Sequence, residues 1–153
     1  MKFARGVVTY IANQHFPRML LPYPPEFTET LTFDICARIH DQCVDFREDY
    51  PNAFEELFEG YEKTCNNFCI VSKRLADTFL LLNYTHSRLI KFCCEISEYA
   101  VCMFKEGCSD AFEIAIFAIF RVLWTMTAYW DNAVENPTIS NHWRYLDIFC
   151  KWT

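Results

Sequence analysis

The apolar residues of this chain recur mostly at steps of three and four, the period of helices that pack along one side. A first helix is predicted over residues 3–13. Prolines at 17, 22, 24 and 25 then exclude regular helix and predict a connecting loop. A second helix, which Thr30 can cap, carries an apolar stripe of Leu31, Ile35, Ile39 and Cys43.

Pro51 marks the end of that helix and suits the opening turn of a short third helix, in which Gly60 is a weak point. The apolar positions of the third helix are Phe54, Leu57, Phe58 and Tyr61. A fourth helix carries Phe68, Val71, Leu75, Phe79 and Leu82. Residues 83–87 form the next break.

Two helices further along, over residues 88–104 and from a cap at Ser109 or Asp110 to about residue 130, are apolar nearly all round. Gly107 separates them, and a last short helix with Trp143, Leu146 and Phe149 follows Pro137. Helices without a wide polar face belong inside a bundle. We therefore predict one all-α domain over residues 1–153, in which two central hydrophobic helices are wrapped by amphipathic ones.

Composition narrows the classes of partner. The chain has 153 residues, only three glycines and a formal charge of −6, with no basic run. Nucleic acid and anionic membrane surfaces are therefore not expected partners. The apolar run over residues 111–130 contains Glu113 and Arg121, so a core helix is expected rather than a membrane span. No hydrophobic tail precedes Thr153, and no permanent membrane anchor is expected.

The nine cysteines do not form a recognisable disulfide framework. Their number is odd, and most lie at helical spacing beside apolar residues, where a reduced cysteine acts as a small hydrophobe. The N-terminus lacks a convincing signal peptide. A reducing, cytoplasmic location is therefore predicted.

Three segments carry a resemblance to a known family. Residues 85–92 read Thr-His-Ser-Arg-Leu-Ile-Lys-Phe, which looks like an Asn-Trp-Gly-Arg signature at the start of a central helix. Residues 36–43 are similar to a BH3 pattern, with His40 where glycine or alanine is usual, and Trp130 to Asn132 with His142 and Trp143 look like a later homology segment. In this order and on these helices, they make the chain resemble the Bcl-2 family of apoptosis regulators.

The strong divergence is more like a viral member, and residues 47–50 and 54–57 look similar to the small adenoviral apoptosis inhibitor. The resemblance implies an inhibitor of apoptosis that sequesters BH3-containing proapoptotic proteins in a hydrophobic groove, acts in the cytoplasm or at mitochondria, and needs no cofactor. Arg88 would meet the ligand's aspartate. The implied groove residues are Phe54, Leu57, Phe58, Leu75, Phe79, Thr85, Ser87, Arg88 and Ile90.

Alternatives stay open for these residues. Arg88 can instead cap its own helix start or pair with Glu95, and on periodicity alone the Phe and Leu stripes are more typical of a core than of a groove. Ser87, in place of glycine, adds a side chain that narrows the groove. The same fold could then be a viral decoy with an occluded groove that binds innate-immune signalling adaptors. Exposed Trp and Phe on the late helices would equally mark a homodimer face.

An enzyme using Cys36 and His40, which lie one helical turn apart, is a third and weaker reading. No second Cys/His pair completes a metal site, and no glycine-rich phosphate loop is present. We therefore expect no catalysis and no bound metal.

Overall fold

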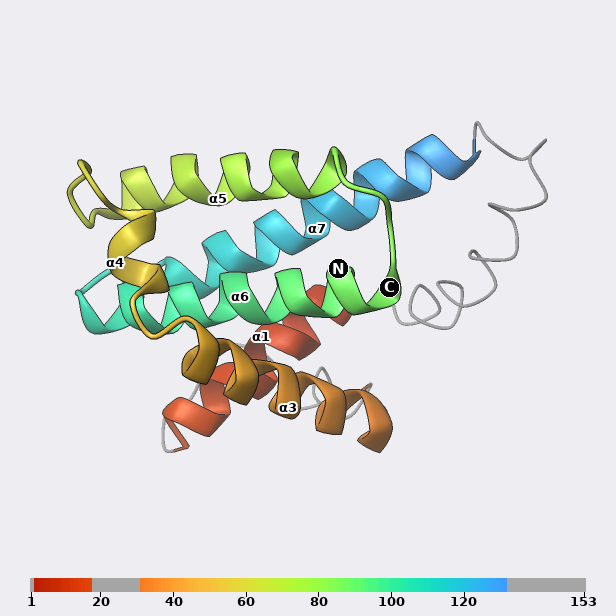
Figure 1. Cartoon of the computed structure of the whole chain (residues 1–153), viewed down its shortest axis with the longest axis horizontal. Coiled ribbons are helices and arrows are strands. Elements are labelled where there is room, and N and C mark those ends of the chain that lie inside the picture. The colour runs from red at the N-terminus through yellow and green to blue at the C-terminus, as the bar shows by residue number, and fades with distance from the viewer. Residues whose placement is uncertain (1, 18–30, 132–153) are drawn as a thin grey trace.

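The computed structural model describes residues 2–17 and 31–131, with side chains up to residue 126. The described residues form six helices and no strand (Figure 1). Their bounds are α1 Lys2–His15, α3 Phe33–Asp49, α4 Ala53–Leu57, α5 Cys65–Leu80, α6 His86–Lys105 and α7 Ala111–Asp131. The all-helical class predicted from the hydrophobic pattern is confirmed.

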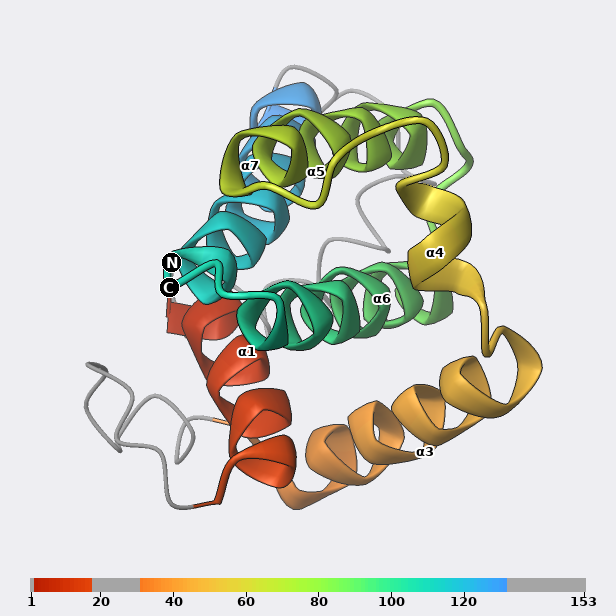
Figure 2. The same ribbon diagram turned by 90° about the vertical axis from the view of Figure 1, so that its left-hand side faces the viewer.

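Helix α6 lies at the centre of the bundle, between α3 and α5 (Figure 2). Helix α6 packs against α1, α3, α5 and α7, while α7 packs against α1, α5 and α6. Most of α6 is buried, with Leu89, Ile96 and Met103 almost fully so. Helix α7 is less enclosed, because Phe117 and Trp124 are exposed. In the described part of the chain, no helix combines enough length and hydropathy to cross a membrane.

Several helix ends differ from the prediction. Thr32 caps α3 by accepting a hydrogen bond from the Ile35 amide, while Thr30 lies outside the described residues. Helix α4 ends at Leu57, before Phe58 and Tyr61. Gly60 lies beyond α4 with φ of 80°, a left-handed conformation that suits a turn and not a helix interior. Pro51 lies in the turn before α4.

Gly107, with φ of 100°, follows the end of α6 as predicted. The expected last helix with Trp143, Leu146 and Phe149 lies outside the described residues, as does most of the segment at 130–143.

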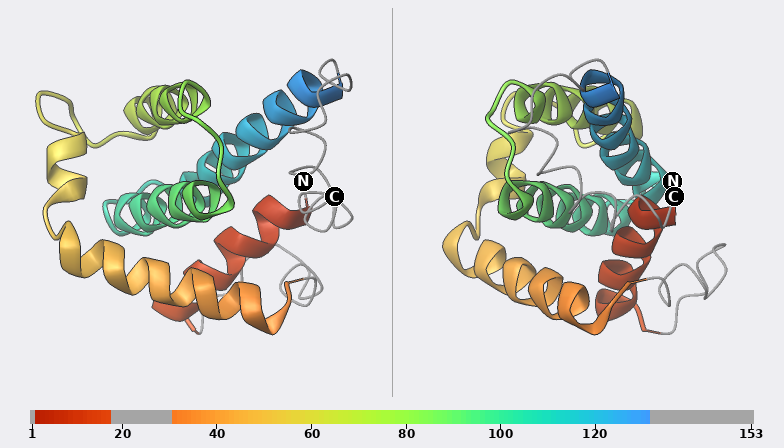
Figure 3. Two further views of the ribbon diagram at one scale, coloured as in Figure 1. Left: turned by 45° about the vertical axis from the view of Figure 1, so that its right-hand side comes forward. Right: turned by 90° about the vertical axis from the view of Figure 1, so that its right-hand side faces the viewer.

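The chain from α3 through α4 to α5 runs around one side of α6. Figure 3 shows α4 linking the end of α3 to the start of α5, with α6 between those two helices. Inside this path, Ile35, Ile39 and Cys43 of α3 lie in the core, as their helical spacing predicts. This path places residues of α3, α4 and α5 around one side of α6.

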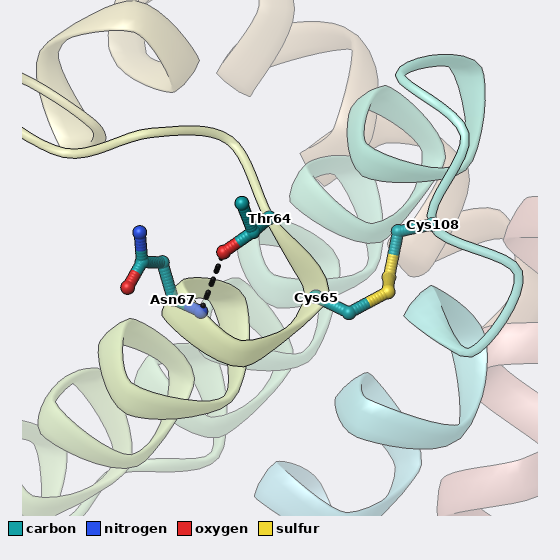
Figure 4. Close-up of a disulfide and its surroundings, with 4 residues drawn as sticks. All are labelled: Thr64, Cys65, Asn67 and Cys108. Carbon is teal, nitrogen blue, oxygen red and sulfur yellow. Dashed lines mark hydrogen bonds between the residues drawn. A yellow bond between two sulfur atoms is a disulfide. The ribbon is translucent and has the colours of Figure 1, made fainter.

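A disulfide ties the start of α5 to the turn between α6 and α7 (Figure 4). It joins Cys65 and Cys108, whose Cα atoms are 5.4 Å apart. Next to it, Thr64 caps α5 by accepting a hydrogen bond from the Asn67 amide at 3.2 Å. The expectation that the cysteines are reduced hydrophobes is wrong for this pair, so the cysteines no longer support the inference of a reducing compartment. The spacing of 43 residues within the pair carries no local signature, so only the fold brings the two thiols together.

Cys65→Ser should lower the melting temperature of the oxidised chain by about 10 °C. A cross-link over this separation contributes about 4 kcal/mol by restricting the unfolded chain, and about 2–4 °C accompanies each kcal/mol at this size. Circular dichroism melts with and without reductant provide the measurement.

Cys69→Ser is the matched control, because Cys69 is a free, exposed cysteine of the same helix. Equal melting temperatures for the wild type and Cys65→Ser under oxidising conditions would contradict this role of the disulfide.

Candidate binding groove

A groove of about 350 Å³ opens between the α3–α4 segment and α5, over the side of α6. Its volume falls in the range of about 300–1,000 Å³ that is usual for ligand clefts. The residues that line it are Phe46, Tyr50, Ala53, Glu56, Leu57, Leu75, Lys91, Glu95 and Tyr99. Four helices therefore contribute to one concave surface.

Two of the residues implied by the family resemblance meet in this groove. Leu57 comes from α4 and Leu75 from α5, and both are partly buried. Tyr99 of α6 lies below them and packs edge-on against Phe46, with ring centroids 5.7 Å apart. The groove thus has leucines on two walls and a mixed floor, to which α6 contributes Lys91, Glu95 and Tyr99.

Phe54 and Phe58 lie beside the groove and do not line it. Phe58 is 3% exposed and belongs to the core, where its ring lies 6.4 Å from that of Phe68. Phe54 packs on Phe58 at 5.2 Å and turns toward a second concavity described below. Of the two phenylalanines, Phe58 is therefore a core residue, as the alternative to a groove role allowed.

Phe79 and Ile90 are also core residues. Phe79 is 8% exposed and packs on Phe92, with ring centroids 5.1 Å apart. Ile90 is 6% exposed. Neither lines the groove, and the Phe79 ring packs from α5 onto Phe92 of α6. Periodicity marks a residue as apolar and inward, and it does not distinguish a core position from a groove wall.

The first turn of α6 contains Ser87 and Arg88, and Thr85 precedes the helix as its N-cap. The Thr85 hydroxyl accepts a hydrogen bond from the Arg88 amide at 3.1 Å and so caps the helix. The Arg88 guanidinium donates to the carbonyl of Asn83 at 2.6 Å. Ser87 and Arg88 are exposed, and neither lines the groove. Arg88 thus holds the turn before its own helix, as the alternative reading allowed.

Lys91, Glu95 and Tyr99 are groove residues that the sequence reading missed. At 100° per residue, the spacing 91–95–99 keeps them on one face of α6. Glu98, Cys102 and Lys105 fall on the same third of the helix surface. The prediction that this helix is apolar nearly all round left out its narrow polar face. A helical projection of the charged residues alone would have found it.

The polar groups of the groove are partly engaged with one another. The Tyr99 hydroxyl donates to a carboxylate oxygen of Glu95 at 3.0 Å. Burial, followed by the charge of Glu95, raises the pKa of the Tyr99 phenol. Tyr99 therefore stays neutral as a donor near pH 7. The Lys91 ammonium lies 5.6 Å from the centroid of the Tyr50 ring, a cation–π distance.

A second concavity of about 260 Å³ lies on the α1 side of the α3–α4 segment. It shares Phe46, Tyr50, Ala53 and Tyr99 with the groove, so the two flank the same segment. Glu98 is one of the residues that line it, and the Glu98 side chain is 7% exposed. The Glu98 carboxylate is 3.1 Å from His15 Nε2 and 3.8 Å from Arg47 Nε. One buried carboxylate therefore links α1, α3 and α6.

The pair of Cys36 and His40 was the candidate for a catalytic centre. Cys36 and His40 are not paired, since His40 Nδ1 lies 3.4 Å from the side-chain oxygen of Gln14. Burial raises the pKa of the Cys36 thiol, and the neighbouring Cys94 thiol together with burial raises that of Cys43. A raised thiol pKa disfavours the thiolate form that catalysis and metal binding require. Within residues 2–17 and 31–131, no three His, Cys, Asp or Glu side chains gather as a metal site.

Comparison with known proteins adds no relative. No family model, no curated protein and no solved structure matches the chain.

His15→Ala should lower the free energy of unfolding by about 1–3 kcal/mol, because it leaves the buried Glu98 carboxylate with one fewer partner. Urea denaturation measures the change. Asn13→Ala, at an exposed position of the same helix, should change stability by less than about 0.5 kcal/mol. Equal effects of the two substitutions would show that Glu98 does not depend on His15.

Proposed function

We propose that the chain is a divergent, Bcl-2-like inhibitor of apoptosis that binds the BH3 helix of proapoptotic proteins in the groove between α4 and α5. The observation that carries this proposal is the groove itself, with Leu57 and Leu75 facing it from two helices and Tyr99 at its floor. The sequence resemblance supplies the class of ligand. An amphipathic helix with apolar residues at three- and four-residue steps suits such a groove.

The energetics are adequate for binding. Each apolar ligand side chain that becomes fully buried contributes roughly 1.5–3 kcal/mol. Three or four such anchors can outweigh association costs of several kcal/mol. Sequestration by this route requires no catalytic group and no cofactor. The expected place of action is the cytoplasm and the mitochondrial surface, where BH3-containing proteins trigger cell death.

Isothermal titration calorimetry with a panel of synthetic BH3 peptides tests the proposal. We expect submicromolar affinity for some peptides, and a loss of at least tenfold in Leu75→Glu, since a carboxylate would be placed in an apolar contact. Leu82→Glu is the control, because Leu82 is exposed beyond the end of α5. The proposal fails if no peptide binds at roughly tens of micromolar.

A functional readout separates inhibition from promotion of cell death. Isolated mitochondria challenged with a BH3-containing activator should retain cytochrome c when wild-type protein is present. Leu75→Glu should not protect them, while Leu82→Glu should. Release of cytochrome c by the protein alone would indicate a proapoptotic role.

The alternative function is a decoy that binds innate-immune signalling adaptors through another surface. One observation favours it: Phe117 and Trp124 are 58% and 65% exposed on α7 and lie seven residues apart, on one side of the helix. Such aromatic residues are common at protein interfaces. Phe117→Ala with Trp124→Ala would abolish adaptor binding or homodimer formation and leave peptide binding intact. Sedimentation velocity and a pull-down of purified adaptor domains provide the measurements.

A further inference from the structure

Lys91 is the one basic residue among the described residues that line the groove. It comes from α6 and lines the groove together with Glu56 of α4 and Glu95 of α6. Its ammonium lies over the Tyr50 ring, at the end of α3. Among the described side chains, no carboxylate comes within 4.0 Å of this ammonium to form a salt bridge. The nearby Glu95 carboxylate instead accepts the Tyr99 hydroxyl.

Arg88 is less suited to the same task in this conformation. Its guanidinium donates to the Asn83 carbonyl at 2.6 Å, and it does not line the groove. To reach a ligand it would have to leave that carbonyl, which forms part of the turn before α6. Lys91 lies one turn further along the same face of α6 and needs to give up only a contact with an aromatic ring.

We propose that Lys91, and not Arg88, is the residue that pairs with the acidic side chain of a helix bound in the groove. The proposal rests on the proposed function, because it concerns the same groove and the same class of ligand. A lysine ammonium is a compact charge without the planar fork of arginine, so it places weaker demands on the direction of the ligand carboxylate. The pair sets the register of the ligand more than its affinity.

Charge in the groove also restricts the ligand sequence. Lys91 shares the groove with two carboxylates, Glu56 and Glu95. A ligand acid near Lys91 is attracted, whereas an acid near Glu56 or Glu95 is repelled. The groove therefore selects helices with one acidic residue near Lys91 and with basic or neutral residues near the two carboxylates, which is specificity by repulsion as well as attraction.

A charge-swap titration tests the assignment. The probe is the BH3 peptide that binds the wild type most tightly, together with the same peptide carrying lysine in place of its central aspartate. Lys91→Glu should weaken the aspartate peptide about tenfold and restore most of the affinity of the lysine peptide. Arg88→Ala and the control Lys73→Ala, an exposed lysine of α5, should each change either affinity less than about twofold.

The other outcomes are decisive. A large loss in Arg88→Ala with no effect of Lys91→Glu would overturn the assignment of Lys91 and leave the proposed function standing. Weaker binding of both peptides to Lys91→Glu, with no restoration, would also overturn it, since it would indicate a structural role that a lowered melting temperature would confirm. If no peptide binds the wild type, the proposed function and the assignment both fail.

Discussion

The enclosure of α6 is the constraint on which the rest of this structure depends. Its apolar surface packs against α1, α3, α5 and α7, so only one narrow face carries charged residues. The α3–α4 segment packs over part of that charged face. The buried Glu98 carboxylate is stable there because His15 and Arg47 approach it from α1 and α3. Removing one partner from a buried charge is costly, so this link fixes the path of the segment that forms one groove wall.

The opposite wall is held from a different direction. Helix α5 packs chiefly against α7 and much less against α6. The Cys65–Cys108 disulfide fixes its start, and Arg121 of α7 donates to Asp77 of α5 at 3.1 Å. Because α5 is anchored to α7 and α4 departs from α3, a gap remains between the two over Tyr99, Glu95 and Lys91. The groove is thus a consequence of where the two walls are fastened.

This arrangement also explains the character of the groove. Its walls are apolar because Leu57 and Leu75 continue the inward stripes of their helices, while its floor is mixed because it is the polar face of α6. A surface of this kind suits an amphipathic helix that presents apolar anchors and one acid. On α6, the Cys93 thiol is buried and the Cys102 thiol is partly buried, and burial raises the pKa of both.

Apolar residues at steps of three and four specify which side of each helix is buried, so the sequence predicts the all-helical class and the order of the described helices. The family resemblance implied Leu57 and Leu75 as groove residues, and both line the concavity between α4 and α5. Periodicity does not separate groove walls from core, so it could not show that Phe58, Phe79 and Ile90 belong to the core. Arg88 bonds to a carbonyl five residues before it, a local contact that the sequence already left open as an alternative. The tertiary structure brings Cys65 to Cys108 and places Lys91 beside Leu57 and Leu75, because these contacts depend on how helices cross, which local periodicity does not encode.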